Sequence, residues 1–168
     1  MLAEDALSRA SGKQTVGLAA PPRVVIDTNV WLDLFVFHDP AARALALALQ
    51  GHTLVAICSS QTDAELLAVL ARPRFARLAG ACGSALMQQW QALAQFVPTW
   101  GSAPWQCRDS NDQKFLDLAY SAGAHTLFTK DRALLRLARA ARRAGLRIIA
   151  PVDFDPAPNS CPVQNSDC

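Results

Sequence analysis

Four acidic side chains stand where a strand is expected to end or a helix to begin. In sequence order they are Asp27 after "RVVI", Glu65 early in the helix that follows "TLVAICSS", Asp112 before "QKFLDLA", and Asp131 after "TLFTK". In an open parallel α/β sheet, ligands bind outside the carboxyl ends of the strands, near the point where the strand order reverses. If the strands are parallel, all four carboxylates therefore meet at one edge of the sheet.

Such a group of like charges points to a bound cation. Carboxylates that lie close together raise one another's pKa values unless a cation neutralises them. The donors are oxygens, and no His or Cys adjoins any of the four acids, so a hard ion such as Mg²⁺ or Mn²⁺ is favoured over Zn²⁺. Asp27 is the strongest candidate, because a charge at the end of a buried strand costs desolvation energy unless something positive meets it. Asn29 would then orient a ligand or a water molecule without adding charge.

The other three acids also have structural explanations, and the sequence leaves these open. Asp131 can be the N-cap of the following helix, and "SNDQ" can be a capping box that places Asp112 in a first helical turn. Ser60 and Asp63 can form another box, which would leave Glu65 as a solvated helix residue. Acids are common at helix starts because they interact favourably with the helix dipole.

Alternating strands and helices must position these side chains. Short β-branched runs predict strands, and longer amphipathic or Ala/Leu-rich runs predict helices. The expected order is a strand over 23–27, a helix over 39–51, a strand over 53–59, helices near 61–71 and 84–95, a strand over 96–100, a helix over 112–123, a strand over 125–129, a helix over 131–145 and a strand over 146–150. This alternation predicts an α/β fold with a mainly parallel sheet covered on both faces.

Composition predicts one soluble domain. The chain has 168 residues, of which 51% are hydrophobic, and a net charge of +2 that does not by itself demand nucleic acid. Its five cysteines contain no C-x-x-C pair, which favours a reducing cytoplasm over a disulfide framework or zinc site. No apolar run is long enough to span a membrane, so no membrane partner is expected. We expect a flexible leader over 1–22, with one short helix near 3–10, and a disordered tail over 155–168.

Four segments of the sequence resemble a known family. They are "VVIDTNVWLDLF", "DAELLAVLARPRF", "CRDSNDQKFLDLAYSAGAHTLFTKDRALL" and "IIAPVDF", in that order. Together they resemble the PIN-domain proteins, particularly the VapC-like toxin components of toxin–antitoxin systems. The similarity implies a PIN-like nuclease domain over 23–154, built as a three-layer α/β/α sandwich around a mainly parallel sheet. It also implies a Mg²⁺- or Mn²⁺-dependent nuclease site of three or four acids.

Matched by motif, the resemblance assigns the catalytic and metal-binding roles to Asp27, Glu65, Asp112 and Asp131. Asn29 and Thr129 match polar positions that flank such a site.

The chain departs from the family pattern at one motif. Where relatives often read "RDPDDDKF", this chain reads "RDSNDQKF", so Asn111 and Gln113 replace two acids. If Asp112 is not the third ligand, the remaining candidates are Asp109 and Asp117.

The leading hypothesis is a metal-dependent endoribonuclease. One or two divalent ions can both activate water and relieve charge on a phosphodiester, so no covalent residue is needed. The resemblance implies single-stranded RNA as substrate, an antitoxin protein as partner of a toxin, and a homodimer. The alternative is a catalytically impaired PIN-like module that binds RNA or protein. A phosphohydrolase of the haloacid-dehalogenase kind is disfavoured, because that chemistry uses an acid where this chain has Asn29.

Basic residues near the expected site could contact the substrate. Lys130 and Arg74 are the preferred phosphate contacts, because both are expected near the rim of the site, Lys130 next to the proposed ligand Asp131 and Arg74 beside Pro73. A stripe at helical spacing could also track a phosphate backbone, although an amphipathic helix needs a polar outer face in any case. Its members are Arg132, Arg136, Arg139 and Arg143.

Overall fold

The computed structural model describes residues 20–75, 83–98 and 101–156. Most of the predicted leader, including the short helix near 3–10, and residues 157–168 of the predicted tail lie outside these ranges. No helix within the described residues combines the length and apolar character that crossing a membrane requires.

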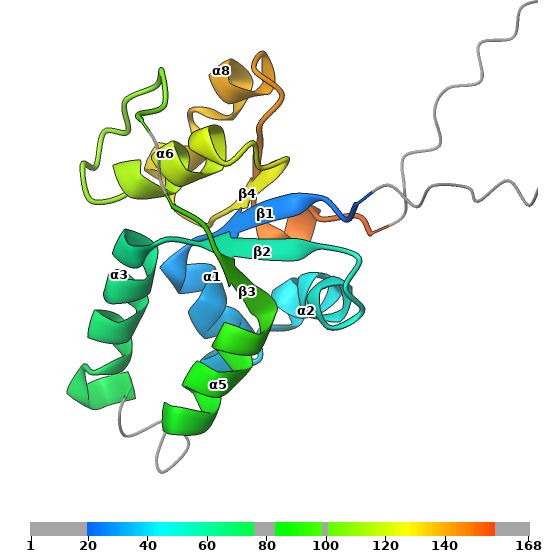
Figure 1. Cartoon of the computed structure of the whole chain (residues 1–168), viewed down its shortest axis with the longest axis vertical. Helices are drawn as coiled ribbons and strands as arrows, with labels where there is room; N and C mark the ends of the chain where they lie inside the picture. The colour runs from blue at the N-terminus through cyan, green and yellow to red at the C-terminus, as the bar shows by residue number, and fades with distance from the viewer. Residues whose placement is uncertain (1–19, 76–82, 99–100, 157–168) are drawn as a thin grey trace, which may run out of the picture.

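One parallel sheet forms the centre of the described structure (Figure 1). Its five strands are β1 (Arg23–Ile26), β2 (Val55–Cys58), β3 (Ala94–Phe96), β4 (Thr126–Phe128) and β5 (Arg147–Ile149). They lie in the order β3-β2-β1-β4-β5, so the chain builds outward from β1 and later returns to place β4 on its other side. Ile26 pairs with Phe128 at the carboxyl ends of β1 and β4. The strand order therefore reverses between these two strands, where ligands bind in such sheets.

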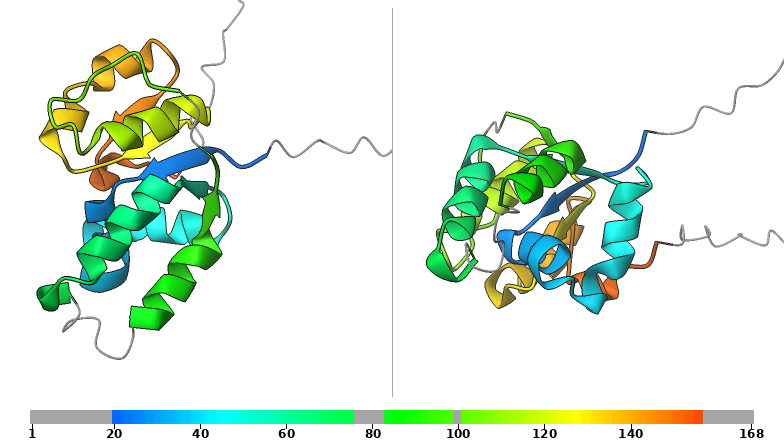
Figure 2. Two further views of the ribbon diagram at one scale, coloured as in Figure 1. Left: turned by 60° about the vertical axis from the view of Figure 1, so that its left-hand side comes forward. Right: turned by 90° about the horizontal axis from the view of Figure 1, so that it is seen from below.

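Helices cover both faces of the sheet. The helices α1 (Thr28–Leu32), α2 (Arg43–Gln50), α3 (Ser60–Leu70) and α5 (Gly83–Leu93) lie on one face. The other face carries α6 (Gln113–Ser121), α7 (Arg132–Leu135) and α8 (Ala138–Arg142), as the left view of Figure 2 also shows. Alternate side chains of β1 belong to different cores: Val24 packs with Leu45 and Trp31, whereas Val25 packs with Leu116. The predicted three-layer α/β/α sandwich is confirmed.

Three local features differ from the sequence-based expectation. Helix α1 and a π-helical turn (Asp33–Phe37) follow β1 directly, within a segment for which no helix was predicted. Strand β3 begins at Ala94 and ends at Phe96, so it shares only Phe96 with the predicted strand over 96–100. Pro98 has no N–H with which to continue the ladder. The predicted helix over 131–145 is divided into α7 and α8. A 3₁₀-type hydrogen bond from the Leu137 N–H to the Leu134 carbonyl marks the break.

Candidate active site

Asp27 lies at the carboxyl end of β1 and is almost completely buried. Its residue surface is 2% exposed, and its backbone N–H donates to the Phe128 carbonyl of β4 at 2.9 Å. Its carboxylate accepts a hydrogen bond from the Thr129 hydroxyl at 2.7 Å and one from the Asn29 N–H at 3.2 Å. Burial raises the pKa of Asp27 most, and the charges of Glu65 and Asp131 raise it further, although the two hydrogen bonds oppose them. No described residue forms an ion pair with Asp27.

Thr129 connects the ends of β1 and β4. It is fully buried directly after β4, and while its hydroxyl donates to Asp27 it also accepts from the Asp131 N–H at 2.9 Å. Asp131 in turn is the N-cap of α7, as one interpretation of the sequence expected. Both capping bonds, from the N–H groups of Ala133 and Leu134, reach the same carboxylate oxygen, Oδ1. Capping therefore orients Asp131 without using its second oxygen.

Asp112 precedes α6 but does not cap it. The helix begins at Gln113, so the predicted capping box from Ser110, which would have placed Asp112 in the first turn, does not form. Asp112 occupies the N-cap position with a helical backbone, and its side chain makes no capping hydrogen bond. Burial, followed by the negative charges of neighbouring carboxylates, raises the pKa of Asp112 to about 6. The neighbours, in order of effect, are Asp27, Asp131, Asp109 and Glu65. Asp112 therefore shares its electrostatic environment with the other three predicted acids.

Glu65 reaches the same edge from α3. The capping box of this helix forms between Ser59 and Thr62, one residue earlier than the predicted Ser60 box, so neither Asp63 nor Glu65 takes part in it. The Glu65 carboxylate forms an ion pair with Lys114 of α6. Lys114 lies two residues after Asp112 in the sequence, but its pairing with Glu65 was not predicted.

We refer to Asp27, Glu65, Asp112 and Asp131 as the acid cluster. No three His, Cys, Asp or Glu side chains in the described part of the chain are grouped closely enough to hold a metal ion in this conformation. The chemistry of the donors nevertheless fits a hard divalent cation, because all are carboxylate oxygens and the pKa values of Asp27 and Asp112 are raised where a cation would lower them. Coordination would require these side chains to move closer together, and Lys114 already occupies one carboxylate oxygen of Glu65.

Two residues that follow Asp112, Gln113 and Asp117, hold the segment 103–107 by hydrogen bonds. Asp117 accepts hydrogen bonds from the Ala103 N–H at 2.8 Å and from the Gln113 amide at 2.9 Å. The Gln113 carbonyl oxygen also accepts from the Cys107 N–H at 2.7 Å. Gln113 and Asp117 are therefore directed to the segment 103–107. Asp109 is exposed and accepts from the Asn111 N–H at 2.9 Å, while its charge contributes to the raised pKa of Asp112.

Of the remaining predicted residues, Asn29 is exposed and only its backbone N–H is seen to contact Asp27. Lys130 turns to a second pair of acids, with its ammonium 2.6 Å from Asp33 and 3.7 Å from Asp39. The hydrogen bond to Asp33 is the main cause that raises the pKa of Lys130. We refer to Asp33, Asp39 and Lys130 as the lysine-bridged pair.

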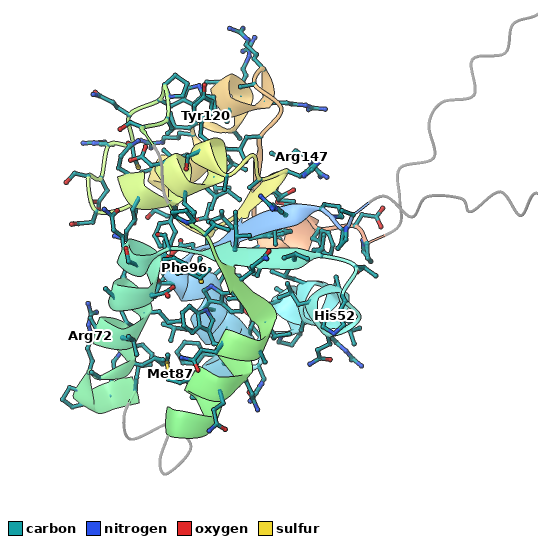
Figure 3. The ribbon with its side chains drawn as sticks, viewed as in Figure 1. His52, Arg72, Met87, Phe96, Tyr120 and Arg147 are labelled. Carbon is teal, nitrogen blue, oxygen red and sulfur yellow. The ribbon has the colours of Figure 1, made fainter. Side chains whose placement is uncertain are left out.

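Arg74 follows the end of α3, and its guanidinium lies 4.3 Å from the centre of the Phe75 ring. Glu65 is the middle residue of this eleven-residue helix, which is about 16 Å long, and it lies nine residues before Arg74. Figure 3 shows Arg72, two residues before Arg74, near the C-terminal end of α3. The roles of Arg74 and Lys130 as phosphate contacts stay predictions.

Comparison with known proteins agrees with this geometry. A family model described as "PIN domain" matches residues 23–133. Among solved structures, the fold is similar to a chain in the crystal structure of VapBC2 from Rickettsia felis bound to a DNA fragment from their promoter. The identity is 15%, the TM-score is 0.53, and the match covers 76% of this chain and 98% of the other. No curated protein sequence matches significantly.

Proposed function

This chain belongs to the PIN-domain family, and from that membership we propose that it is a metal-dependent endoribonuclease acting on single-stranded RNA. PIN domains are generally nucleases and generally use divalent metal ions. The observation that carries the proposal is the position of the acid cluster at the reversal of strand order between β1 and β4. Four carboxylates from distant parts of the sequence influence one another there, and a Mg²⁺ or Mn²⁺ ion would relieve their repulsion.

Each acid is supported differently for this role. Thr129 and the Asn29 N–H fix the Asp27 carboxylate, and the N–H groups of α7 fix one oxygen of Asp131. Asp112 has no capping bond to give up. When bound, a divalent ion supplies water activation and charge relief on the phosphate. The protein would thus present oriented carboxylate oxygens and leave the nucleophile to water.

We also propose that the protein is the toxin of a toxin–antitoxin pair, with an antitoxin protein as its partner. The support is the similar fold of the chain in the VapBC2 structure. At 15% sequence identity, this similarity concerns the fold alone. A homodimer and a cytoplasmic location stay predictions. Co-expression with the product of an adjacent small reading frame, followed by copurification and a cleavage assay, would test the partner. An adjacent product that neither binds nor inhibits the protein would count against the pairing.

One observation favours the alternative, a catalytically impaired PIN-like module that binds RNA or protein. Glu65 is engaged by Lys114, and no three acids of the described chain stand within reach of one ion. If this arrangement persists in Mg²⁺ or Mn²⁺, the protein would bind RNA without turning it over.

A cleavage assay separates the two functions. Purified protein is incubated with end-labelled single-stranded RNA in EDTA and then with Mg²⁺ or Mn²⁺ restored, and single-stranded DNA is included as a second substrate. We expect cleavage only with metal, and we expect Asp27→Asn to abolish it. Asp33→Asn is the matched control, because it makes the same change at a buried aspartate outside the acid cluster. Cleavage in EDTA that survives Asp27→Asn would overturn the mechanism, and RNA binding without cleavage would favour the module.

A further inference from the structure

Three arginines line an open pocket beside the acid cluster. The pocket has a volume of about 480 Å³ and is lined by Arg108, Arg132 and Arg136 together with Ser110, Asp109 and Asp131. Asp131 belongs to both the pocket and the acid cluster. A ligand bound in the pocket would therefore lie next to whatever the acid cluster holds.

The arginines come from two segments that are distant in the sequence. Arg132 and Arg136 are four residues apart around α7 and so share one side of it, while Arg108 lies in the segment before α6. All three are exposed, and within the described residues none forms an ion pair. Guanidinium groups bind phosphate oxygens through paired N–H donors, so this arrangement suits a phosphate better than a single ammonium would.

Charge and lining indicate which part of a substrate fits. The three guanidinium groups outnumber the carboxylates of Asp109 and Asp131, and Asp131 already accepts two N–H groups of α7. The pocket is therefore net positive before any cation binds nearby. No aromatic side chain lines it, so it offers no surface for stacking a base. These features favour the sugar-phosphate backbone, whose recognition does not depend on sequence.

We propose that Arg108, Arg132 and Arg136 bind the RNA backbone phosphate that neighbours the phosphate at the acid cluster. The proposal rests on the proposed function, since it takes the substrate to be single-stranded RNA. It places the substrate strand across α7, in a direction that leads away from β1 past Asp131. It also divides the predicted arginine stripe, because only its first two members belong to this pocket.

A second basic groove, beside α8 and β5, provides a matched control. It has a volume of about 440 Å³ and is lined by Arg139, Arg142 and Arg147 with the neighbouring strand β5. Arg147 is the first residue of β5, and Figure 3 shows it on the side of the sheet where the strands begin. The acid cluster lies at the opposite ends of these parallel strands. Removing two charges here changes the net charge equally without touching the proposed phosphate site.

The experiment measures binding of a dye-labelled oligouridine by fluorescence anisotropy. Asp27→Asn serves as the background so that no cleavage is expected, and Mg²⁺ and several salt concentrations are used. We compare Arg132→Gln/Arg136→Gln with Arg139→Gln/Arg142→Gln. The first pair should weaken binding by about tenfold or more, because charge-assisted hydrogen bonds are lost. It should also reduce the salt dependence by about 0.7 for the lost phosphate contact. The second pair should change binding by less than about twofold, because distant exposed charges are screened.

Equal weakening by the two pairs, or none by the first, would overturn the arginine pocket. Melting temperatures verify that the variants are folded. We expect them to fold, because the substituted side chains are exposed. Cleavage by the protein with Asp27 intact is scored separately. Metal-dependent cleavage combined with equal binding by both pairs would overturn the pocket alone. Selective weakening without any cleavage would retain the pocket as an RNA-backbone site and overturn the nuclease.

In the protein with Asp27 intact, the double variant Arg132→Gln/Arg136→Gln should have a higher KM for RNA and a nearly unchanged kcat. A phosphate contact beside the reacting group is made equally in the bound substrate and in the transition state. A fall in kcat with KM unchanged would instead place these arginines at the reacting phosphate and overturn the neighbouring-phosphate assignment.

Discussion

The acid cluster and the lysine-bridged pair differ in how their buried carboxylates are neutralised. Asp27 and Asp33 lie six residues apart and are 2% and 6% exposed. Asp33 has the Lys130 ammonium 2.6 Å away, and Lys130 also reaches Asp39. Asp27 has only a hydroxyl and a backbone N–H as hydrogen-bond donors. Two aspartates of similar burial therefore differ in whether the protein provides a countercharge.

Sequence position makes this difference informative. Lys130 stands between Thr129 and Asp131, the two residues that form the β4 side of the acid cluster, yet its ammonium is at Asp33. A buried charge without a partner lowers stability, so such a residue is better explained by function than by folding. The position of the lysine ammonium groups, more than the position of the acids, distinguishes the candidate active site from a structural ion pair.

The largest expected effect is that of Asp27→Asn on cleavage. Loss of a central carboxylate should reduce the cleavage rate by about 10³-fold or more, since metal-assisted charge stabilisation contributes several kcal/mol. The free energy of unfolding in EDTA should stay the same or rise, because a neutral amide is less costly to bury than a carboxylate. Cleavage rates and urea unfolding curves measure both. A large loss of stability would show that Asp27 is structural, like Asp33.

The second effect is the reverse pattern for Asp33→Asn. The free energy of unfolding should fall by about 1–2 kcal/mol, because the charged hydrogen bond to Lys130 is lost. Lys130 is 45% exposed and can be solvated again, which limits the loss. Cleavage should change by less than about twofold, measured under the same conditions as Asp27→Asn. Abolished cleavage in a folded Asp33→Asn protein would remove the distinction between the two groups.

The acid cluster should also make the metal-free protein less stable as the pH rises. The pKa of Asp112 is raised from 3.8 to about 6, and that of Asp27 is raised in the same direction. Between these values the folded protein binds more protons than the unfolded chain, so the free energy of unfolding falls as pH increases. Urea midpoints in EDTA from about pH 4 to about pH 7 measure this slope.

Asp112→Asn is the control for this pH dependence. It should flatten the curve, because the titrating carboxyl group is removed, and saturating Mn²⁺ should oppose the fall by favouring the charged form. A metal-free protein that becomes more stable across this range would contradict the raised pKa values, which come from burial and from repulsion within the acid cluster.

The fold was largely predictable because burial on both faces constrains the strands. Parallel strands covered by helices are continuous apolar runs, and "VVI" and "VAIC" show this pattern. Local breaks were less predictable. The division at Leu137 has no signal in the sequence, because Leu134 and Ala141 pack into one core at the seven-residue spacing of an unbroken helix and no Pro or Gly marks the break. Helix α1 was missed because its Val and Trp residues also suit a strand.

The position of the acids at one edge of the sheet could be predicted from topology, but their partners could not. Once β1 and β4 are adjacent and parallel, Asp27 and Asp131 must lie at the same edge. The directions of long lysine side chains depend on contacts across space. Lys130 was expected to face a phosphate, and the acid it contacts lies on the π-helical turn that the sequence did not indicate. Lys114 likewise crosses from α6 to α3.

The smallest expected effect concerns Lys114, the exception in the acid cluster. It is the only lysine or arginine that forms an ion pair with an acid-cluster member among the described residues, and its pairing with Glu65 competes with metal coordination. Lys114→Met should therefore raise the affinity for Mn²⁺ by about three- to fivefold, the value of a partly exposed ion pair. Isothermal titration calorimetry measures this without RNA. Lys130→Met is the matched control, and it should lower stability while leaving Mn²⁺ affinity unchanged. Weaker Mn²⁺ binding by Lys114→Met alone would mean that Lys114 holds Glu65 in position for the ion, and the two lysines would then share a structural role.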